Sequence, residues 1–158
     1  MQQHPRRSRL MAVAFVAAVT VGLAGLVRSE ETPAEEKARL HKLDTGPATI
    51  DVSKYPSEQQ AAYPLFQKKC AQCHKIARAI NTNFVLPSEW ERYIKRMMYK
   101  PNSKLKEDDG KTIYRFLTYD SSVRKADSLR VHLKNLPAAE QEEALEKIHK
   151  VNPTFVEK

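Results

Sequence analysis

The chain has two cysteines, and they stand three residues apart in the segment KKCAQCHKIAR, residues 68–78. His74 follows Cys73 directly. A CxxC pair is typical of three chemistries: a redox dithiol, half of a zinc site, and, where a histidine follows, thioether attachment of haem. The rest of the sequence helps to separate these three possibilities.

The dithiol and the zinc site both lack supporting residues. A thioredoxin-like dithiol follows a strand inside a βαβ pattern, and no such strand is expected before Cys70. A structural zinc site requires four ligands, whereas the histidines that follow the predicted signal and lie outside the motif are scattered over the predicted linker and tail, at His41, His132 and His149. Neither chemistry assigns a role to His74.

Thioether attachment accounts for the whole motif. Each thiol adds to a vinyl group of haem, and the histidine after the second cysteine becomes the proximal ligand of the iron. No thiol then remains free in an oxidising compartment. The sequence therefore predicts one covalently bound haem c, with Cys70 and Cys73 as attachment sites and His74 as an axial iron ligand.

A methionine is the expected sixth ligand. The first two of the four methionines lie in a predicted N-terminal signal, which leaves Met97 and Met98. On a helix predicted from about residue 88 to 99, Met97 shares an apolar face with Trp90 and Ile94, while Met98 lies at the edge of that face. We therefore predict Met97 as the ligand and Met98 as the runner-up.

Two alternatives to a methionine ligand stay open. His132 or His149 would give bis-histidine ligation and a lower reduction potential. An open or exchangeable sixth position would suit a haem-based sensor or a small peroxidase-like enzyme.

Residues 1–28 resemble an export segment, either a signal peptide or a signal anchor. A basic start, HPRRSR, precedes the uncharged apolar run Leu10–Val27. Such a run is longer than most secretory cores, of about 7–15 residues, and matches a membrane span of about 17–25. The arginines before it predict that the remainder lies on the periplasmic side of the bacterial inner membrane, either anchored there or released by cleavage.

The remaining sequence predicts an all-α protein. We expect a charged linker over residues 29–56, which includes a helical stretch and a short strand-like TIDV. Helices are then predicted over residues 57–70, 88–99, 107–119, 122–136 and 137–151. Ser88 and Glu91 match a capping box at the start of the second of these. The haem domain is expected at 57–119 and a helical C-terminal extension at 120–158.

Three segments together resemble a known family. CAQCH at 70–74, WERYIKRM at 90–97 and IYRFL at 113–117 are similar to small monohaem class I cytochromes c of bacteria. The resemblance implies a class I cytochrome c fold over residues 57–119, Met97 as the axial ligand, and a last helix that crosses the helix before CxxCH. Ala62 stands where the family often has glycine at that crossing.

Charge suggests the kind of partner. The formal net charge is +8, and residues 61–117 hold twelve basic and five acidic side chains. No nucleic-acid-binding motif accompanies this charge, so nucleic acid is not an expected partner. A basic surface around a haem would instead attract redox proteins with acidic docking surfaces.

The function predicted from the sequence is therefore one-electron transfer rather than enzymatic catalysis. Besides the sensor, one alternative remains, in which the chain is the haem-bearing subunit of a larger membrane oxidoreductase or reaction-centre complex.

Overall fold

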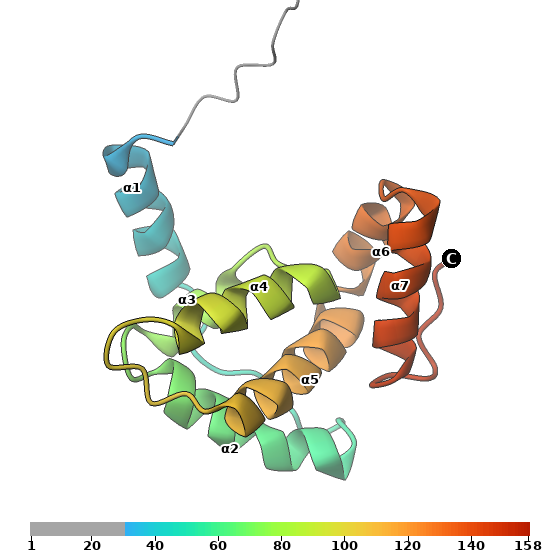
Figure 1. Cartoon of the computed structure of the whole chain (residues 1–158), viewed down its shortest axis with the longest axis horizontal. Coiled ribbons are helices and arrows are strands. Elements are labelled where there is room, and N and C mark those ends of the chain that lie inside the picture. The colour runs from blue at the N-terminus through green and yellow to red at the C-terminus, as the bar shows by residue number, and fades with distance from the viewer. Residues whose placement is uncertain (1–30) are drawn as a thin grey trace, which may run out of the picture. The chain divides into compact units, whose positions relative to one another are not determined.

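The computed structural model describes residues 31–158. Seven α-helices follow one another there: α1 (Pro33–Asp44), α2 (Ser57–Cys70), α3 (Ile76–Asn81), α4 (Pro87–Met98), α5 (Glu107–Arg124), α6 (Ala126–Lys134) and α7 (Ala138–His149) (Figure 1). No strand occurs among the described residues, TIDV included. The prediction of an all-α protein is confirmed, whereas that of a strand-like segment is not.

Residues Thr32–Lys158 form one compact unit. Within residues 31–158, no helix combines the length and the apolar character needed to cross a membrane. The export segment predicted over residues 1–28 lies outside the described residues.

Three helices, α2, α4 and α5, enclose the main core. Because α5 packs against both α2 and α4, the core lies along its inner face. Phe66, Trp90 and Phe116 are fully buried there. The rings of Phe66 and Phe116 lie 5.2 Å apart, and Trp90 meets Phe84 and Tyr93 edge-on. Burial of one large apolar side chain contributes about 1.5–3 kcal/mol, so these rings fix the relative positions of the three helices.

The start of α4 differs from the prediction. Its N-cap is Leu86 rather than Ser88, and Pro87 occupies the first turn, where a missing N–H costs nothing. The Glu89 carboxylate accepts hydrogen bonds from the backbone N–H groups of Val85 and Leu86, both at 2.8 Å. Glu91, the predicted capping partner of Ser88, instead pairs with lysines. The predicted capping box is therefore wrong by two residues.

Helix α5 continues five residues beyond the predicted end at Tyr119, because the added turn makes buried polar contacts. The carboxylate of Asp120 accepts from the Tyr55 hydroxyl at 2.9 Å and pairs with Arg124. Ser121 accepts from the indole N–H of Trp90 at 2.8 Å. The expected boundary between residues 119 and 120 thus falls inside a helix.

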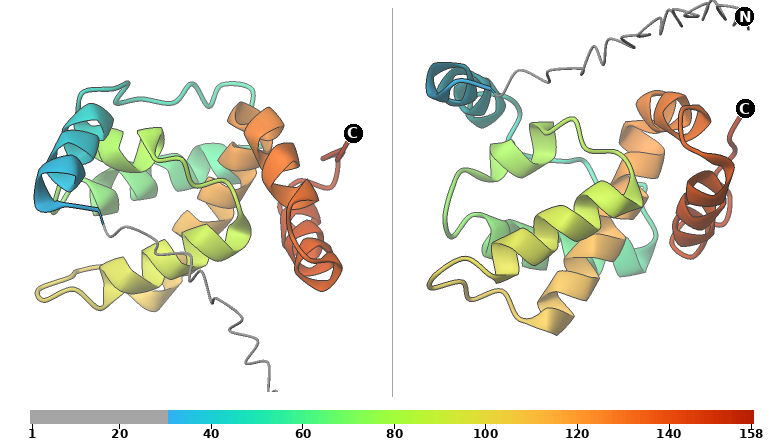
Figure 2. Two further views of the ribbon diagram at one scale, coloured as in Figure 1. Left: turned by 90° about the horizontal axis from the view of Figure 1, so that it is seen from above. Right: turned by 45° about the horizontal axis from the view of Figure 1, so that its top comes forward.

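Helices α6 and α7 lie at the C-terminal end of α5 (Figure 2). They enclose a second hydrophobic core. They pack against each other and against α5. The apolar side chains of this core come from both helices, from the loop before α4 and from the C-terminal segment: Val85, Leu86, Leu129, Leu133, Ala144, Ile148 and Phe155. The predicted C-terminal extension is therefore a folded helix pair that packs on the remainder of the chain.

The region predicted as a linker also takes part in the fold. Helix α1 packs on α3, and Ile50 and Tyr55 are buried in the main core. The backbone N–H of Ile50 donates to the Tyr63 hydroxyl at 2.8 Å, so a side chain rather than a neighbouring strand satisfies it.

Candidate haem site

The CxxCH segment lies at the end of a helix that the core holds in place. Cys70 is the last residue of α2, Cys73 stands in the turn that follows, and His74 precedes the short helix α3. Phe66, one turn before Cys70, anchors this end of α2 in the core. Both thiols are free, with Cys70 half-buried and Cys73 exposed.

The two ring nitrogens of His74 have different partners. Nδ1 lies 2.9 Å from the carbonyl oxygen of Lys75, which can only accept, so Nδ1 donates. In the neutral imidazole the lone pair is then on Nε2, which lies 3.2 Å from the Tyr93 hydroxyl. A hydrogen bond from the second nitrogen to a carbonyl is the usual way in which a metal-binding histidine is oriented. His74 therefore has a lone pair on Nε2 that could bind a metal ion.

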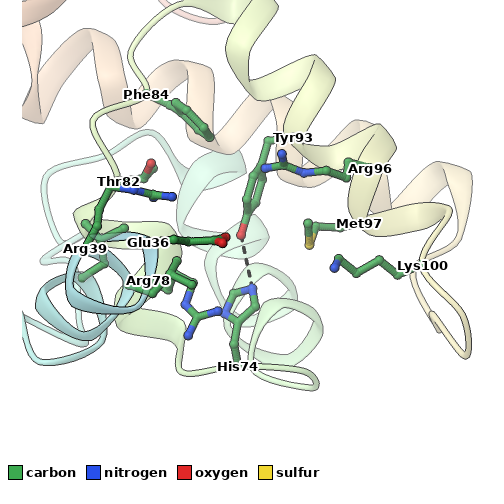
Figure 3. Close-up of a pocket in the computed structure, with 12 residues that line it drawn as sticks. Glu36, Arg39, His74, Arg78, Thr82, Phe84, Tyr93, Arg96, Met97 and Lys100 are labelled. Carbon is green, nitrogen blue, oxygen red and sulfur yellow. Dashed lines mark hydrogen bonds between the residues drawn. The ribbon is translucent and has the colours of Figure 1, made fainter. Parts of the chain in front are cut away.

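A cavity of about 320 Å³ lies above His74. Figure 3 shows Tyr93, Arg96, Met97 and Lys100 along one wall, with the Met97 sulfur beside Tyr93 and Lys100. The opposite wall is formed by α1, α3 and the loop after α3, and its members are Glu36, Arg39, Leu40, Leu43, Arg78, Thr82 and Phe84. The volume is within the lower range of ligand-binding cavities.

A second cavity, of only about 30 Å³, adjoins the first. Its lining includes all four residues that the sequence assigns to haem binding: Cys70, Cys73, His74 and Met97. The structure therefore brings the two thiols, the imidazole and the thioether together, although 23 positions separate His74 from Met97.

Met98, the runner-up, faces another part of the molecule. It lines a groove with residues of α5 and α7, together with Ile94 and Gly110. A Cβ atom placed on Gly110 would lie 2.9 Å from the Met98 sulfur, so this side chain is packed on α5. Met98 lines neither of the cavities beside His74.

The other histidines within residues 31–158 lie apart from these cavities. His132 donates to the Ser128 carbonyl at 2.8 Å on α6, and the Nε2 of His149 lies 3.2 Å from the Phe155 carbonyl near the end of α7. His41 is exposed on α1. In the described part of the chain, no group of three or more His, Cys, Asp or Glu side chains could hold a metal ion.

Sequence reasoning missed several members of the site. Tyr93 lies on the buried face of α4, but its contact with His74 depends on how α4 packs over the CxxCH turn. Arg96 lies over the Tyr93 ring at 5.6 Å from its centre. Leu40 and Leu43 come from the predicted linker, where their three-residue spacing on a helix was the available signal of an apolar face.

Burial raises the pKa of the Cys70 thiol to about 12. A redox dithiol depends on a cysteine with a lowered pKa, because the thiolate is the reactive form. Cys70 has the opposite environment, because its burial disfavours the charged thiolate.

The side chains around the two cavities are of the types that hold a covalently attached haem. Two thiols stand at the spacing for thioether bonds, an oriented imidazole supplies nitrogen, and a methionine lines the same cavity. No protein-family model, curated protein or solved structure matches this chain.

Proposed function

We propose that the chain is a monohaem c-type cytochrome that carries one electron at a time between redox partners outside the cytoplasm. The observation that supports this proposal best is that Cys70, Cys73, His74 and Met97 line one cavity. When bound there, haem supplies the Fe(III)/Fe(II) couple that accepts and releases the electron.

Each of the four residues has a separate part in holding the cofactor. Cys70 and Cys73 would form the two thioether bonds. His74 would bind iron through Nε2, in place of its hydrogen bond with the Tyr93 hydroxyl, while its Nδ1 keeps the bond to the Lys75 carbonyl. Met97 would supply the second axial ligand, which raises the reduction potential relative to two histidines.

The apolar residues around the site would limit the access of water. Phe84 lies edge-on to Tyr93, with ring centres 5.7 Å apart, and Leu40 and Leu43 line the wall contributed by α1. A dry surrounding strengthens the effect of nearby charges and controls the reduction potential of a bound metal.

Several cations around the site have no counter-ion of their own. Lys69, Arg78 and Lys95 make ion pairs within the fold. The exposed cations near the site that make no ion pair within residues 31–158 include Lys68, Lys75, Arg92 and Lys100. We propose that they attract acidic redox proteins, and that residues 1–28 bring the chain to the periplasmic side of the membrane.

Covalent attachment is the direct test. The full chain, produced together with the machinery that attaches haem, should be red and should retain its pigment through acid–acetone extraction. The double variant Cys70→Ser/Cys73→Ser should lose the pigment under the same treatment. A colourless wild-type product, or pigment that is extracted from it, would overturn the proposal.

The sixth ligand separates a carrier from a sensor. Reduced protein with methionine ligation should not bind carbon monoxide. Uptake of carbon monoxide by the wild type would favour the alternative, a haem sensor with an exchangeable ligand.

A further inference from the structure

Helix α1 lies on the surface with one side toward the candidate haem site. None of its residues is buried, and α3 is the one helix of the described range on which it packs. Nevertheless, Glu36, Arg39, Leu40 and Leu43 all line the 320 Å³ cavity with His74 and Met97. Helix α1 therefore forms a wall of that cavity without a core of its own to hold it there.

Polar contacts with α3 hold the C-terminal end of α1 in place. The Arg78 Nε donates to Asp44 Oδ1 at 2.9 Å, and its second nitrogen donates to the other carboxylate oxygen. The Asn81 amide donates to the backbone carbonyls of Leu43 and Pro47, both at 3.0 Å. Paired hydrogen bonds between arginine and a carboxylate are stronger than neutral ones and fix orientation.

Both side chains that make these contacts belong to α3, which is packed in the core. On α3, Ala77, Ala79 and Ile80 are almost fully buried, so Arg78 and Asn81 project from a helix that the core holds. Gly46 lets the chain pass close to Asn81, because a Cβ atom there would lie 2.5 Å from the amide nitrogen. The contacts thus join a helix without buried residues to a helix whose neighbouring residues lie in the core.

We propose that α1 is a hinged cover, held closed by Asp44–Arg78 and Asn81, that limits the access of small molecules to the cavity beside His74. Its role at a haem rests on the proposed function, whereas its attachment to α3 does not. The cover makes the site selective, because electrons can pass to a docked protein while small ligands of iron are kept out.

The first measurement tests the attachment of α1. Trypsin can cut α1 after Lys37, Arg39 and Lys42, but cleavage of a helix requires local opening. In Asp44→Ala we expect cleavage at these sites to be about tenfold faster, as for the loss of one charge-assisted contact. Gly46→Ala should act in the same direction without a change in charge. Asp108→Ala is the matched control, because its side chain is 98% exposed on α5.

The second measurement tests whether α1 covers the cavity. Imidazole binding to the oxidised, pigmented protein is followed by absorbance. We expect Asp44→Ala and Gly46→Ala to bind imidazole about tenfold more tightly than the wild type, and Asp108→Ala to be unchanged. Faster cleavage without tighter imidazole binding would overturn the proposal, as would unchanged cleavage in both variants.

A colourless protein would contradict the proposed function. The cover could still be tested in such a protein. Peroxide oxidation of Met97 is then measured by mass spectrometry, with Met98, which lies outside the cavity, as the internal reference. The cover requires faster oxidation of Met97 in Asp44→Ala, with Met98 unchanged. Equal ratios in variant and wild type would overturn it.

Discussion

Two adjacent methionines, Met97 and Met98, have different surroundings. The Met97 side chain lines both cavities beside His74, whereas Met98 lies against Gly110 of α5. Successive residues of a helix point about 100° apart, so only one of the two can face His74. The packing of α4 on α5 determines which one this is.

This arrangement predicts different effects of two similar substitutions. Met97→Ala should abolish the weak near-infrared band that sulfur ligation gives to oxidised haem, and should allow carbon monoxide to bind the reduced form. Met98→Ala should keep the band and lower the free energy of unfolding by about 1–2 kcal/mol, because a half-buried side chain is lost. Absorbance spectra and urea unfolding measure the two effects. Loss of the band in Met98→Ala alone would reverse the assignment.

Lys125 is a cation in a largely buried position. Its ammonium group donates to the carbonyls of Thr82 and Phe84, at 2.6 and 3.2 Å, and lies 5.4 Å from the centre of the Trp90 ring. Burial lowers the pKa of Lys125 to about 8. The charged form is therefore less stable in the folded protein than in water.

The lowered pKa of Lys125 predicts how the free energy of unfolding changes with pH. Between pH 8 and 10.5 the unfolded chain binds the proton and the folded chain does not, so the free energy of unfolding should rise with pH. Relative to Lys125→Met, the wild type should gain about 3 kcal/mol across this range. Tyrosine ionisation affects both proteins and cancels in the difference. Urea unfolding at several pH values measures it, and a constant difference would contradict the prediction.

At the scale of single elements, α4 depends on a cap that differs from the predicted one. The Glu89 carboxylate accepts hydrogen bonds from two backbone N–H groups. These groups have no partner within the helix. Ser88 is exposed. Substitutions of Ser88 and of Glu89 can therefore distinguish the observed cap from the predicted one.

We expect Glu89→Ala to lower the free energy of unfolding by about 1–2 kcal/mol, since it leaves those N–H groups without an acceptor. Glu89→Gln keeps a carbonyl acceptor and should lose less. Ser88→Ala should stay within about 0.5 kcal/mol of the wild type. Thermal and urea unfolding give these values, and a larger loss for Ser88→Ala than for Glu89→Ala would contradict the observed cap.

The longer helices could be predicted from the sequence, and the connecting geometry could not. Apolar spacing placed α2, α4 and α5, since each buries one continuous face. Helix α3 has six residues, which is too short for a periodic pattern, and three of them are small or β-branched core residues. The last turn of α5 is held by Asp120 and Ser121, whose buried partners come from distant segments.

The same division applies to the candidate site. Cys70, Cys73 and His74 form a local motif, and the helical face predicted for Met97 needs only the residues of one helix. By contrast, the contact between Tyr93 and His74 and the wall formed by Leu40 depend on how separate helices pack. A linker rich in charge gives little sign that its helix lines a cavity.

At the scale of the whole molecule, two cores share one chain. The loop before α4 contributes Val85 and Leu86 to the second core, while Trp90 of the same helix belongs to the first. Asn152 donates to Ser122 at 2.8 Å in a buried position between the C-terminal segment and α5. We therefore infer that α6 and α7 support the helix that carries Met97, rather than forming a separate domain.

The distribution of charge should make the proposed electron transfer sensitive to salt. Between about 0.01 M and 1 M salt the Debye length falls from about 30 Å to about 3 Å, which removes long-range attraction. Rates with an acidic redox partner, measured by stopped flow, should therefore fall by about tenfold or more. Lys68→Glu, close to Cys70, should lower the rate at low salt, whereas Lys134→Glu on α6 makes the same change in charge and should have little effect. A local docking surface beside the cysteines would be affected by Lys68→Glu and not by Lys134→Glu. Equal effects of the two variants would therefore mean that the net charge of the protein attracts the partner.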